Sequence, residues 1–387
     1  MSRLHSRDLD APPERPHDVE EGSVVSIFRV PPECAGMRLD RFVQSQLKRT
    51  SRTRAQVIVR NSAYGSGGQR LRTSDRVQAE QLILLWRPPW DEEETDTVLP
   101  ILHEDGELIA VAKPPMIPVH PTARYFRSTV VKLLERDRPG ERHYLAHRLD
   151  RETSGVLLLS KTAEADRHVK RQFAGIDPET GRSDGVRRVV KHYLAIVRGW
   201  PVEERFRIED PLEPDVDNPL RVKMRVAAPG TGLESATSCE VLGRRERSAT
   251  GERYALVRCG LETGRQHQIR VHLSAQGYPL VGDKLYGDDD RLHARAADGE
   301  LSDDDREGLE LPRHALHAHA LELDHPLTGE RLRVESGLWD DLDDFWSALD
   351  EAGAKAGSSP SERATAERLP TRPSGPQRPR GTLSRST

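Results

Sequence analysis

A carboxylate flanked by cations precedes a strongly apolar stretch near the middle of the chain. Asp150 lies between Arg148 and Arg151, and a run of Val and Leu follows at residues 156–159. Aspartate is depleted in strands and usually exposed, so its place at the mouth of a buried strand indicates a side chain held on a rigid edge. Such a carboxylate can act as a nucleophile or a base. The alternative is that Asp150 only caps or turns the chain, with the two arginines as surface ion-pair partners.

Two further segments carry side chains that suit chemistry with a carboxylate. Residues 189–197 alternate as a strand does and include Tyr193. Residues 263–273 include Arg270 and predict a helix that opens at a Thr-Gly pair and ends before a glycine. An arginine can hold a carboxylate in one orientation and favour its charged form. A site forms if the fold brings both side chains to Asp150.

Apolar periodicity predicts the elements that must position these residues. Glycine and proline mark the turns between them. The expected strands are 107–112, the run that ends at residue 160, 189–197, 236–242, 254–261, 314–323 and 331–335. The expected helices, besides 263–273, are 129–136, 163–173 and 338–349.

The formal net charge of -4 conceals blocks of opposite sign. Residues 36–90 hold 11 Lys and Arg against 3 Asp and Glu, whereas residues 288–310 hold 3 against 10. The first block predicts a basic module that binds a polyanion, and the second an acidic insert. The polar, proline-containing ends, residues 1–22 and 351–387, are expected to be disordered, the second as a basic tail.

Composition also argues against several kinds of site and location. No run approaches the length of a membrane span and residues 1–22 hold no apolar stretch, so we expect a cytoplasmic protein without membrane contact. Three cysteines far apart, without CxxC spacing, indicate neither a disulfide framework nor a cysteine metal site. No cysteine or well-spaced carboxylate completes a metal site around the nearby histidines, so no metal is expected. Those histidines are His314, His317, His319 and His325.

The basic block resembles the S4 RNA-binding domain. The resemblance rests on RLDRF at residues 38–42, an SR-rich second helix at 51–59, and a turn that leads into a strand within 77–86. The turn, NSAYG at residues 61–65, departs from the family's V-x-V-N-G, so an altered hairpin is expected. An ordinary solvated helix face is the alternative. The resemblance implies a small α/β domain over residues 23–90. Its charge predicts RNA contacts from arginines with few acids nearby. These are Arg38, Arg41, Arg52 and Arg54.

Four blocks further along together resemble the RluA-type family of pseudouridine synthases. HRLDRETSG at 147–155, KHYLA at 191–195 and TGRQHQIRVH at 263–272 occur in the family's order and at comparable separations. KPPMIPVHP at 113–121 resembles the family's entrance segment, with Met116 where a glycine is usual. The resemblance implies an α+β catalytic fold, a bent, mixed, mostly antiparallel sheet with flanking helices. This domain is expected over residues 98–350, after an acidic linker at 91–97.

The chemistry of that family explains these residue types. Uridine becomes pseudouridine when the C1′–N1 bond breaks, the base turns and a C1′–C5 bond forms, with no net redox change, so no cofactor is expected. By the resemblance, Asp150 is the catalytic carboxylate, Arg270 keeps it charged, and Tyr193 stacks on the flipped uracil. Arg148 corresponds to the residue that enters the RNA stack. Weaker candidates for phosphate or pocket contacts are Lys113, Arg265 and Lys191.

Together these patterns predict a monomeric, cofactor-independent RNA pseudouridine synthase. Structured ribosomal RNA is the expected substrate because an S4-like module suits folded RNA, and transfer RNA is the alternative. Two other classes stay open. One is a non-catalytic RNA-binding or ribosome-assembly factor, against which Asp150, Tyr193 and Arg270 count. The other is a carboxylate-dependent glycosidase or nucleosidase, which needs a second acid at the cleft.

Overall fold

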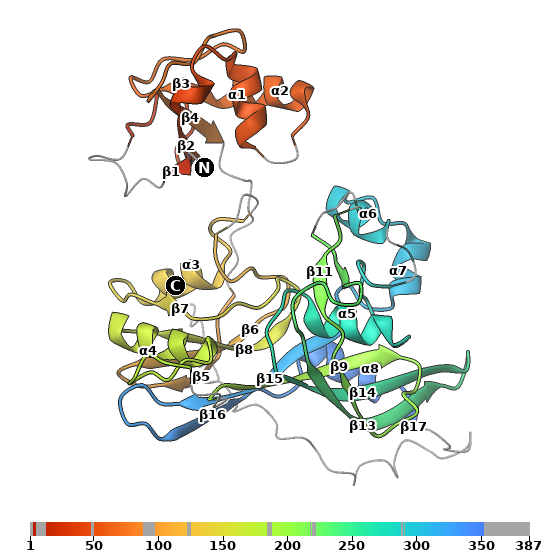
Figure 1. Ribbon diagram of the computed structural model, residues 1–387. Helices are drawn as coiled ribbons and strands as arrows, with labels where there is room; N and C mark the ends of the chain where they lie inside the picture. Colours follow the sequence, from red (N-terminus) through yellow and green to blue (C-terminus); the bar gives the residue numbers. More distant parts are fainter. Residues whose placement is uncertain are drawn as a thin grey trace, which may run out of the picture. The chain divides into compact units, whose positions relative to one another are not determined.

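The computed structural model divides the chain into two compact units, residues 1–93 and 94–387, described here one at a time (Figure 1). The division falls within the predicted linker, but residues 91–96 of that linker lie outside the described residues, as do residues 352–387 of the predicted tail. The described residues are 3–4, 13–47, 50–87, 97–121, 125–183, 188–216, 218, 222–287, 289 and 291–351. None of the helices within these ranges has the length and apolar character that crossing a membrane requires.

The N-terminal unit is a four-stranded antiparallel sheet with two helices. Ser51 starts the second helix, because its hydroxyl accepts a hydrogen bond from the backbone N of Arg54 at 3.2 Å. Phe42, Val59 and Ile83 are among the residues of its apolar core. In spatial order the strands are β1 (Arg3–Leu4), β2 (Val24–Arg29), β4 (Leu82–Arg87) and β3 (Ala63–Gly65), and the helices are α1 (Leu39–Gln46) and α2 (Arg52–Ser62).

The start of this unit differs from the prediction. Val19 is buried in a small apolar cluster with Ile27 and Tyr64. The Asp18 carboxylate accepts hydrogen bonds from the Tyr64 hydroxyl and from Arg70 Nε, both at 3.0 Å. These contacts order residues that the polar composition of 1–22 led us to expect disordered, of which 1–2 and 5–12 lie outside the described residues. The strand predicted within 77–86 is β4, and it pairs with β2. The sequence analysis did not predict β2.

The C-terminal unit is built on one large mixed sheet in which, among the described pairings, only β8 and β15 run parallel. Strands β10, β13, β14, β9, β15, β8, β6 and β5 follow one another across it, while β16 pairs with β15, β17 with β13 and β7 with β8. The bounds are β5 Ile101–Glu104, β6 Leu108–Lys113, β7 Tyr144–Leu145, β8 Ser154–Ser160, β9 Val190–Arg198, β10 Arg205–Ile208, β13 Thr237–Arg247, β14 Glu252–Leu261, β15 Leu316–Asp324, β16 Arg331–Glu335 and β17 Asp350–Glu351. A separate pair consists of β11 (Leu212–Pro214) and β12 (Met224–Val226).

Helices cover both faces of this sheet (Figure 1). α3 (Val130–Asp137) and α5 (Gln268–Ala275) pack on the face that includes Tyr193. α4 (Ala163–Phe173) and α8 (Asp340–Ser347) pack on the opposite face. The acidic insert forms α6 (Leu292–Asp298) and α7 (Asp303–Leu309), and its residues 288 and 290 lie outside the described residues.

The helix predicted over 263–273 begins later, at Gln268. The Gln268 side chain accepts hydrogen bonds from the Thr263 hydroxyl at 2.7 Å and from the backbone N of Arg265 at 3.0 Å, which closes a turn ahead of the helix. The short strands β5, β10, β11 and β12 were not predicted, because three or four residues hold too little alternation to be recognised. The longer strands and helices lie where periodicity predicts them.

Gly155 allows β8 and β15 to lie side by side directly after the Asp150 loop. Its φ is +112°, and a Cβ at this position would lie 2.2 Å from the carbonyl oxygen of Ala318 on β15. Only glycine avoids both the backbone strain and this collision.

Gly155→Ala is therefore expected to lower the free energy of unfolding by about 3 kcal/mol or more, as measured by urea denaturation. Gly106→Ala is the matched control, because a Cβ there meets nothing within 4 Å. Equal stability of the two variants would contradict this account of the β8–β15 contact.

Candidate active site

The Asp150 carboxylate lies in the loop that leads into β8 and is partly open to solvent, with 40% of its side chain exposed. Its main-chain carbonyl accepts a hydrogen bond from the backbone N of Thr153 at 3.2 Å, which turns the loop toward the strand. The sequence analysis predicted this placement at the mouth of a buried strand, and every residue of β8 is buried.

Arg270 reaches the same place from α5. Its Nη1 lies 3.5 Å from Oδ2 of Asp150, while Nε and Nη2 donate to the two carboxylate oxygens of Asp283 at 2.7 and 2.8 Å. Burial alone would raise the pKa of Asp283, but Arg270 and the backbone N–H of Leu285 lower it well below its usual range. Burial opposes the charge of Arg270, yet Asp283 raises its pKa. The pair therefore stays ionised, and one edge of the guanidinium is left for Asp150.

Tyr193 on β9 completes the predicted catalytic set. Its side chain is buried on the face that α5 covers. Burial raises its pKa, and the charge of Asp150 adds to this shift, so the phenol is protonated at neutral pH. The fold thus brings Asp150, Tyr193 and Arg270 together from three separate segments.

A polar network beneath the Asp150 loop joins it to the Asp283 loop. The Glu152 carboxylate binds Nζ of Lys284 at 3.1 and 3.2 Å and accepts from the backbone N of His314 at 3.2 Å. The carbonyl of Glu152 accepts from Arg313, which also forms two 2.7 Å bonds to Asp341 on α8. Since Glu152 is two residues from Asp150, and Lys284 adjoins Asp283, this ion pair links the two halves of the site.

Two of the four histidines considered as metal ligands instead hold this loop. His314 Nε2 lies 2.9 Å from the Thr153 hydroxyl, and His317 Nδ1 lies 2.9 Å from the Ser154 hydroxyl. Burial lowers the pKa of each histidine to about 3, so both are neutral. Among the described residues, no three His, Cys, Asp or Glu side chains are grouped as a metal site.

The prediction that Lys113 contacts RNA is wrong. Its ammonium group is buried and donates to the carbonyls of Pro114, Ile117 and Arg151 at 2.7, 2.8 and 3.0 Å, so it ties the entrance segment to the Asp150 loop. Burial lowers its pKa well below the ordinary value. In the same segment Met116, which replaces the family's glycine, has a left-handed φ of +65°.

The other predicted RNA-binding residues of the C-terminal unit are more accessible. Arg148 is exposed and forms no hydrogen bond or ion pair with another described residue. Arg265 is exposed and donates from Nε to the carbonyl of Glu234 at 3.1 Å. Lys191 is half-buried, with Nζ 5.7 Å from the centre of the Phe173 ring.

In the N-terminal unit the four predicted arginines fall into two pairs. Arg38 binds the buried carboxylate of Asp40 through Nε at 3.1 Å and Nη2 at 3.2 Å, and Arg52 lies 3.7 Å from it. The expectation of few acids nearby is therefore wrong for these two, because Asp40 needs them as a buried anion between α1 and α2. Arg41 and Arg54 are exposed and form no ion pair with a described residue.

The sequence analysis missed Asp283, Lys284 and Tyr286, and the structural role of Glu152. A signal was present: GDKLYG at residues 282–287 places two charges between glycines directly after the apolar run YPLV at 278–281. Gly282 has a φ of +72°, and a Cβ there would lie 2.1 Å from the carbonyl oxygen of Arg313. The tight approach of these two backbones presents Asp283 to Arg270.

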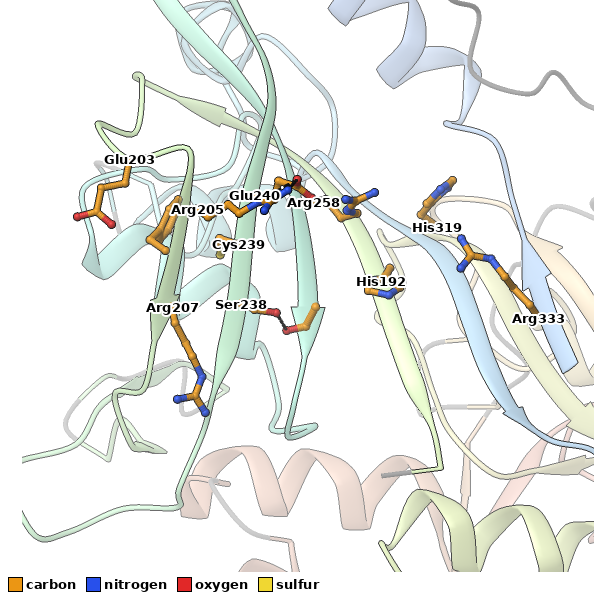
Figure 2. Close-up of a pocket in the computed structure, with 12 residues that line it drawn as sticks. His192, Glu203, Arg205, Arg207, Ser238, Cys239, Glu240, Arg258, His319 and Arg333 are labelled. Carbon is orange, nitrogen blue, oxygen red and sulfur yellow. Dashed lines mark hydrogen bonds and ion pairs between the residues drawn. The ribbon is translucent and has the colours of Figure 1, made fainter. Parts of the chain in front are cut away.

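A pocket of about 790 Å³ lies on the face of the large sheet that points away from Asp150 and Tyr193; Figure 2 shows the residues that line it. His192 lines it, whereas the next residue of β9, Tyr193, faces the site. Its arginines are paired, Arg205 and Arg258 with Glu240 and the others with further glutamates. This pocket is therefore no part of the Asp150 site.

Comparison with known proteins shows the family to which this chain belongs. The family model for RNA pseudouridylate synthase matches residues 107–275. Ribosomal large subunit pseudouridine synthase D of Nitrosomonas europaea is 32% identical over 321 residues, 81% of this chain and 84% of the relative. The chain belongs to the RluA-type family of RNA pseudouridine synthases. Synthase D of Pseudomonas aeruginosa is 34% identical, over 81% of this chain and 92% of the relative. Synthase C of Escherichia coli K12 is 32% identical, over 81% and 93%.

The solved structures include human RNA pseudouridylate synthase domain containing 1, with 25% identity, a TM-score of 0.49, and coverage of 66% of this chain and 96% of that one. The predicted catalytic fold of this synthase, an α+β unit with a mixed sheet and flanking helices, is confirmed.

The site of this synthase offers an accessible carboxylate, a fixed guanidinium and a protonated phenol. These three groups suit chemistry on a neutral base and its sugar.

Asp283→Asn is expected to destabilise the synthase by about 3 kcal/mol, because it leaves Arg270 as a buried charge without its partner. Misplacement of Arg270 is expected to lower the single-turnover rate of pseudouridine formation by about 100-fold. Asp303→Asn on the exposed face of α7 is the control and should match the wild type. An Asp283→Asn variant with wild-type rate and stability would refute the clamping role.

Proposed function

We propose that this synthase converts uridine to pseudouridine in structured ribosomal RNA and that Asp150 is its catalytic carboxylate. The observation that carries the proposal is the accessible Asp150 carboxylate, 3.5 Å from an arginine whose other edge is fixed by Asp283. The named relatives act on the large ribosomal subunit, which supports ribosomal RNA. Transfer RNA is the alternative substrate within the same chemistry.

In this proposal each residue of the site has one task. Asp150 attacks the uridine, and Arg270 keeps the carboxylate charged and in one orientation. Tyr193 stacks on the uracil after it has left the RNA stack, and Arg148 fills the gap that the base leaves. The base stays in the pocket while its C1′–N1 bond is exchanged for a C1′–C5 bond, so no second reactant enters.

The glycosidase alternative is disfavoured by the state of the neighbouring acids. Among the described residues, the carboxylates near Asp150 are Asp283 and Glu152, and both are committed to buried cations, Arg270 and Lys284. A hydrolase would need one of them free to activate water.

Asp150→Asn is expected to abolish pseudouridine formation, because an amide cannot replace the carboxylate. RNA affinity should stay within about twofold of the wild type, and the free energy of unfolding should stay close to that of the wild type. Carbodiimide primer extension on ribosomal RNA from a strain that carries only the variant measures the product. Asp303→Asn serves as the matched control. Full modification by Asp150→Asn would sink the assignment, and modification of transfer RNA alone by the wild type would redirect the substrate.

We further propose that the N-terminal unit is an S4-like domain that binds RNA through Arg41 and Arg54. Replacing both by Gln is expected to weaken RNA binding and to make the slope of log affinity against log salt shallower by about 1.5, since each lost phosphate contact removes about 0.7 to 0.9. The single-turnover rate at saturating enzyme should not change. Arg29→Gln, which removes an arginine paired with Glu80, is the control. An unchanged salt slope in the double variant would contradict the proposal.

A further inference from the structure

His267 immediately precedes α5 and lies beside the Asp150 carboxylate. Its backbone is left-handed, with φ +57° and ψ +16°, a conformation that residues with a Cβ avoid unless their surroundings impose it. Only 10% of its side chain is exposed. Strained, buried residues of this kind concentrate at functional sites.

The hydrogen bonds around Tyr286 determine which ring nitrogen of His267 carries the proton. The backbone N–H of Met224 donates to the Tyr286 hydroxyl at 2.8 Å. That hydroxyl lies 2.8 Å from Nδ1 of His267, and no other acceptor for its proton occurs among the described residues. The phenol therefore donates to Nδ1, and the hydrogen of the neutral ring is on Nε2.

Nε2 of His267 faces the reacting carboxylate. It lies 3.8 Å from Oδ2 of Asp150, the same oxygen that Nη1 of Arg270 approaches at 3.5 Å. At these separations no hydrogen bond from a described residue reaches either oxygen of the carboxylate. The two donors converge on Oδ2 and leave Oδ1 for a ligand.

Burial is the main reason that the His267 ring is neutral. Burial, with the guanidinium of Arg270 and with His293 on α6, lowers the pKa of His267 to about 4, against the opposing effects of Asp150 and Asp283. A neutral ring donates one hydrogen bond without bringing a second positive charge into the site. It can therefore hold Asp150 without adding to the charge that Arg270 supplies.

We propose that His267 is a positioning residue for Asp150, whose Oδ2 accepts a hydrogen bond from Nε2–H of His267 when RNA fills the site. With Oδ2 held by His267 and Arg270, Oδ1 is the oxygen presented to the uridine. Tyr286 acts through His267 as a positioning residue, because its hydroxyl selects the tautomer. The inference rests on the proposed role of Asp150.

Two amide substitutions separate the Nε2 donor from the ring as a whole. His267→Gln places a donor nitrogen near the position of Nε2, whereas His267→Asn places one near Nδ1. Asparagine also tolerates the left-handed backbone best among residues with a Cβ, so strain cannot explain a loss in that variant. The single-turnover rate is expected to fall by about 30- to 100-fold in His267→Asn and to be largely rescued in His267→Gln, with RNA affinity unchanged. Equal rates in the two variants would overturn the proposal.

The tautomer can be observed without reference to activity. In the full chain labelled with ¹⁵N at histidine, the His267 signals are those missing from the His267→Gln spectrum. Over about pH 6 to 8 they should report a protonated Nε2 and an unprotonated Nδ1. Tyr286→Phe should mix the two tautomers. A cationic ring, or a proton on Nδ1 in the wild type, would overturn the proposal.

Asp150→Asn, assayed beside these variants, separates the two levels of inference. If Asp150→Asn retains activity, the proposed function fails. If Asp150→Asn is inactive while His267→Asn matches the wild type, only the role of His267 fails.

Discussion

The buried ion pair between Arg270 and Asp283 constrains everything around the Asp150 carboxylate. A guanidinium this deep requires a carboxylate with good geometry, and Asp283 supplies it through two short bonds. Asp283 in turn is oriented by the backbone N–H groups of Leu285 and Tyr286. Arg270 is therefore fixed before RNA binds, and its free edge defines where a second anion, Asp150, is stabilised. The Asp150 carboxylate lies beside this edge and is 40% exposed, so it is accessible to a substrate.

The loops that carry Asp150 and Asp283 are held together by bonds that do not touch the substrate. Glu152 and Lys284 join them directly, and Arg313 connects the Asp150 loop to Asp341 on α8. Partners that are both buried and hydrogen-bonded tolerate little movement, because any separation leaves a charge unpaired. The separations of 3.5 and 3.8 Å at Asp150 are thus short enough for a small side-chain adjustment to close when RNA binds, without rearrangement of the network.

Sequence patterns located most of the long elements because apolar periodicity reflects which face is buried. Helix 163–173 has the predicted bounds, and Tyr193 lies on a predicted strand. Patterns could not show which cations are buried or paired with an acid. Lys113 and Arg52 have the same residue types as RNA-binding cations, yet Lys113 is buried among carbonyls and Arg52, although exposed, faces the Asp40 carboxylate. The start of α5 was misplaced because the Gln268 side chain closes the preceding turn, and this local hydrogen bond leaves no periodic pattern of apolar residues.

The negative net charge is compatible with an RNA substrate because of how the acids are distributed. On the sheet face opposite the site, Glu240 pairs with both Arg205 and Arg258, so part of the positive charge there is compensated. In the acidic insert, Arg295 forms ion pairs with Asp289 and Asp305, so part of the negative charge of the insert is compensated within it. Within the part of the chain that the structure describes, Arg148 beside Asp150, and Arg41 and Arg54 in the N-terminal unit, are exposed cations without an acidic partner. Because pairing weakens the attraction of an arginine for phosphate, exposed arginines without an acidic partner, such as these three, attract a polyanion more than the total charge indicates.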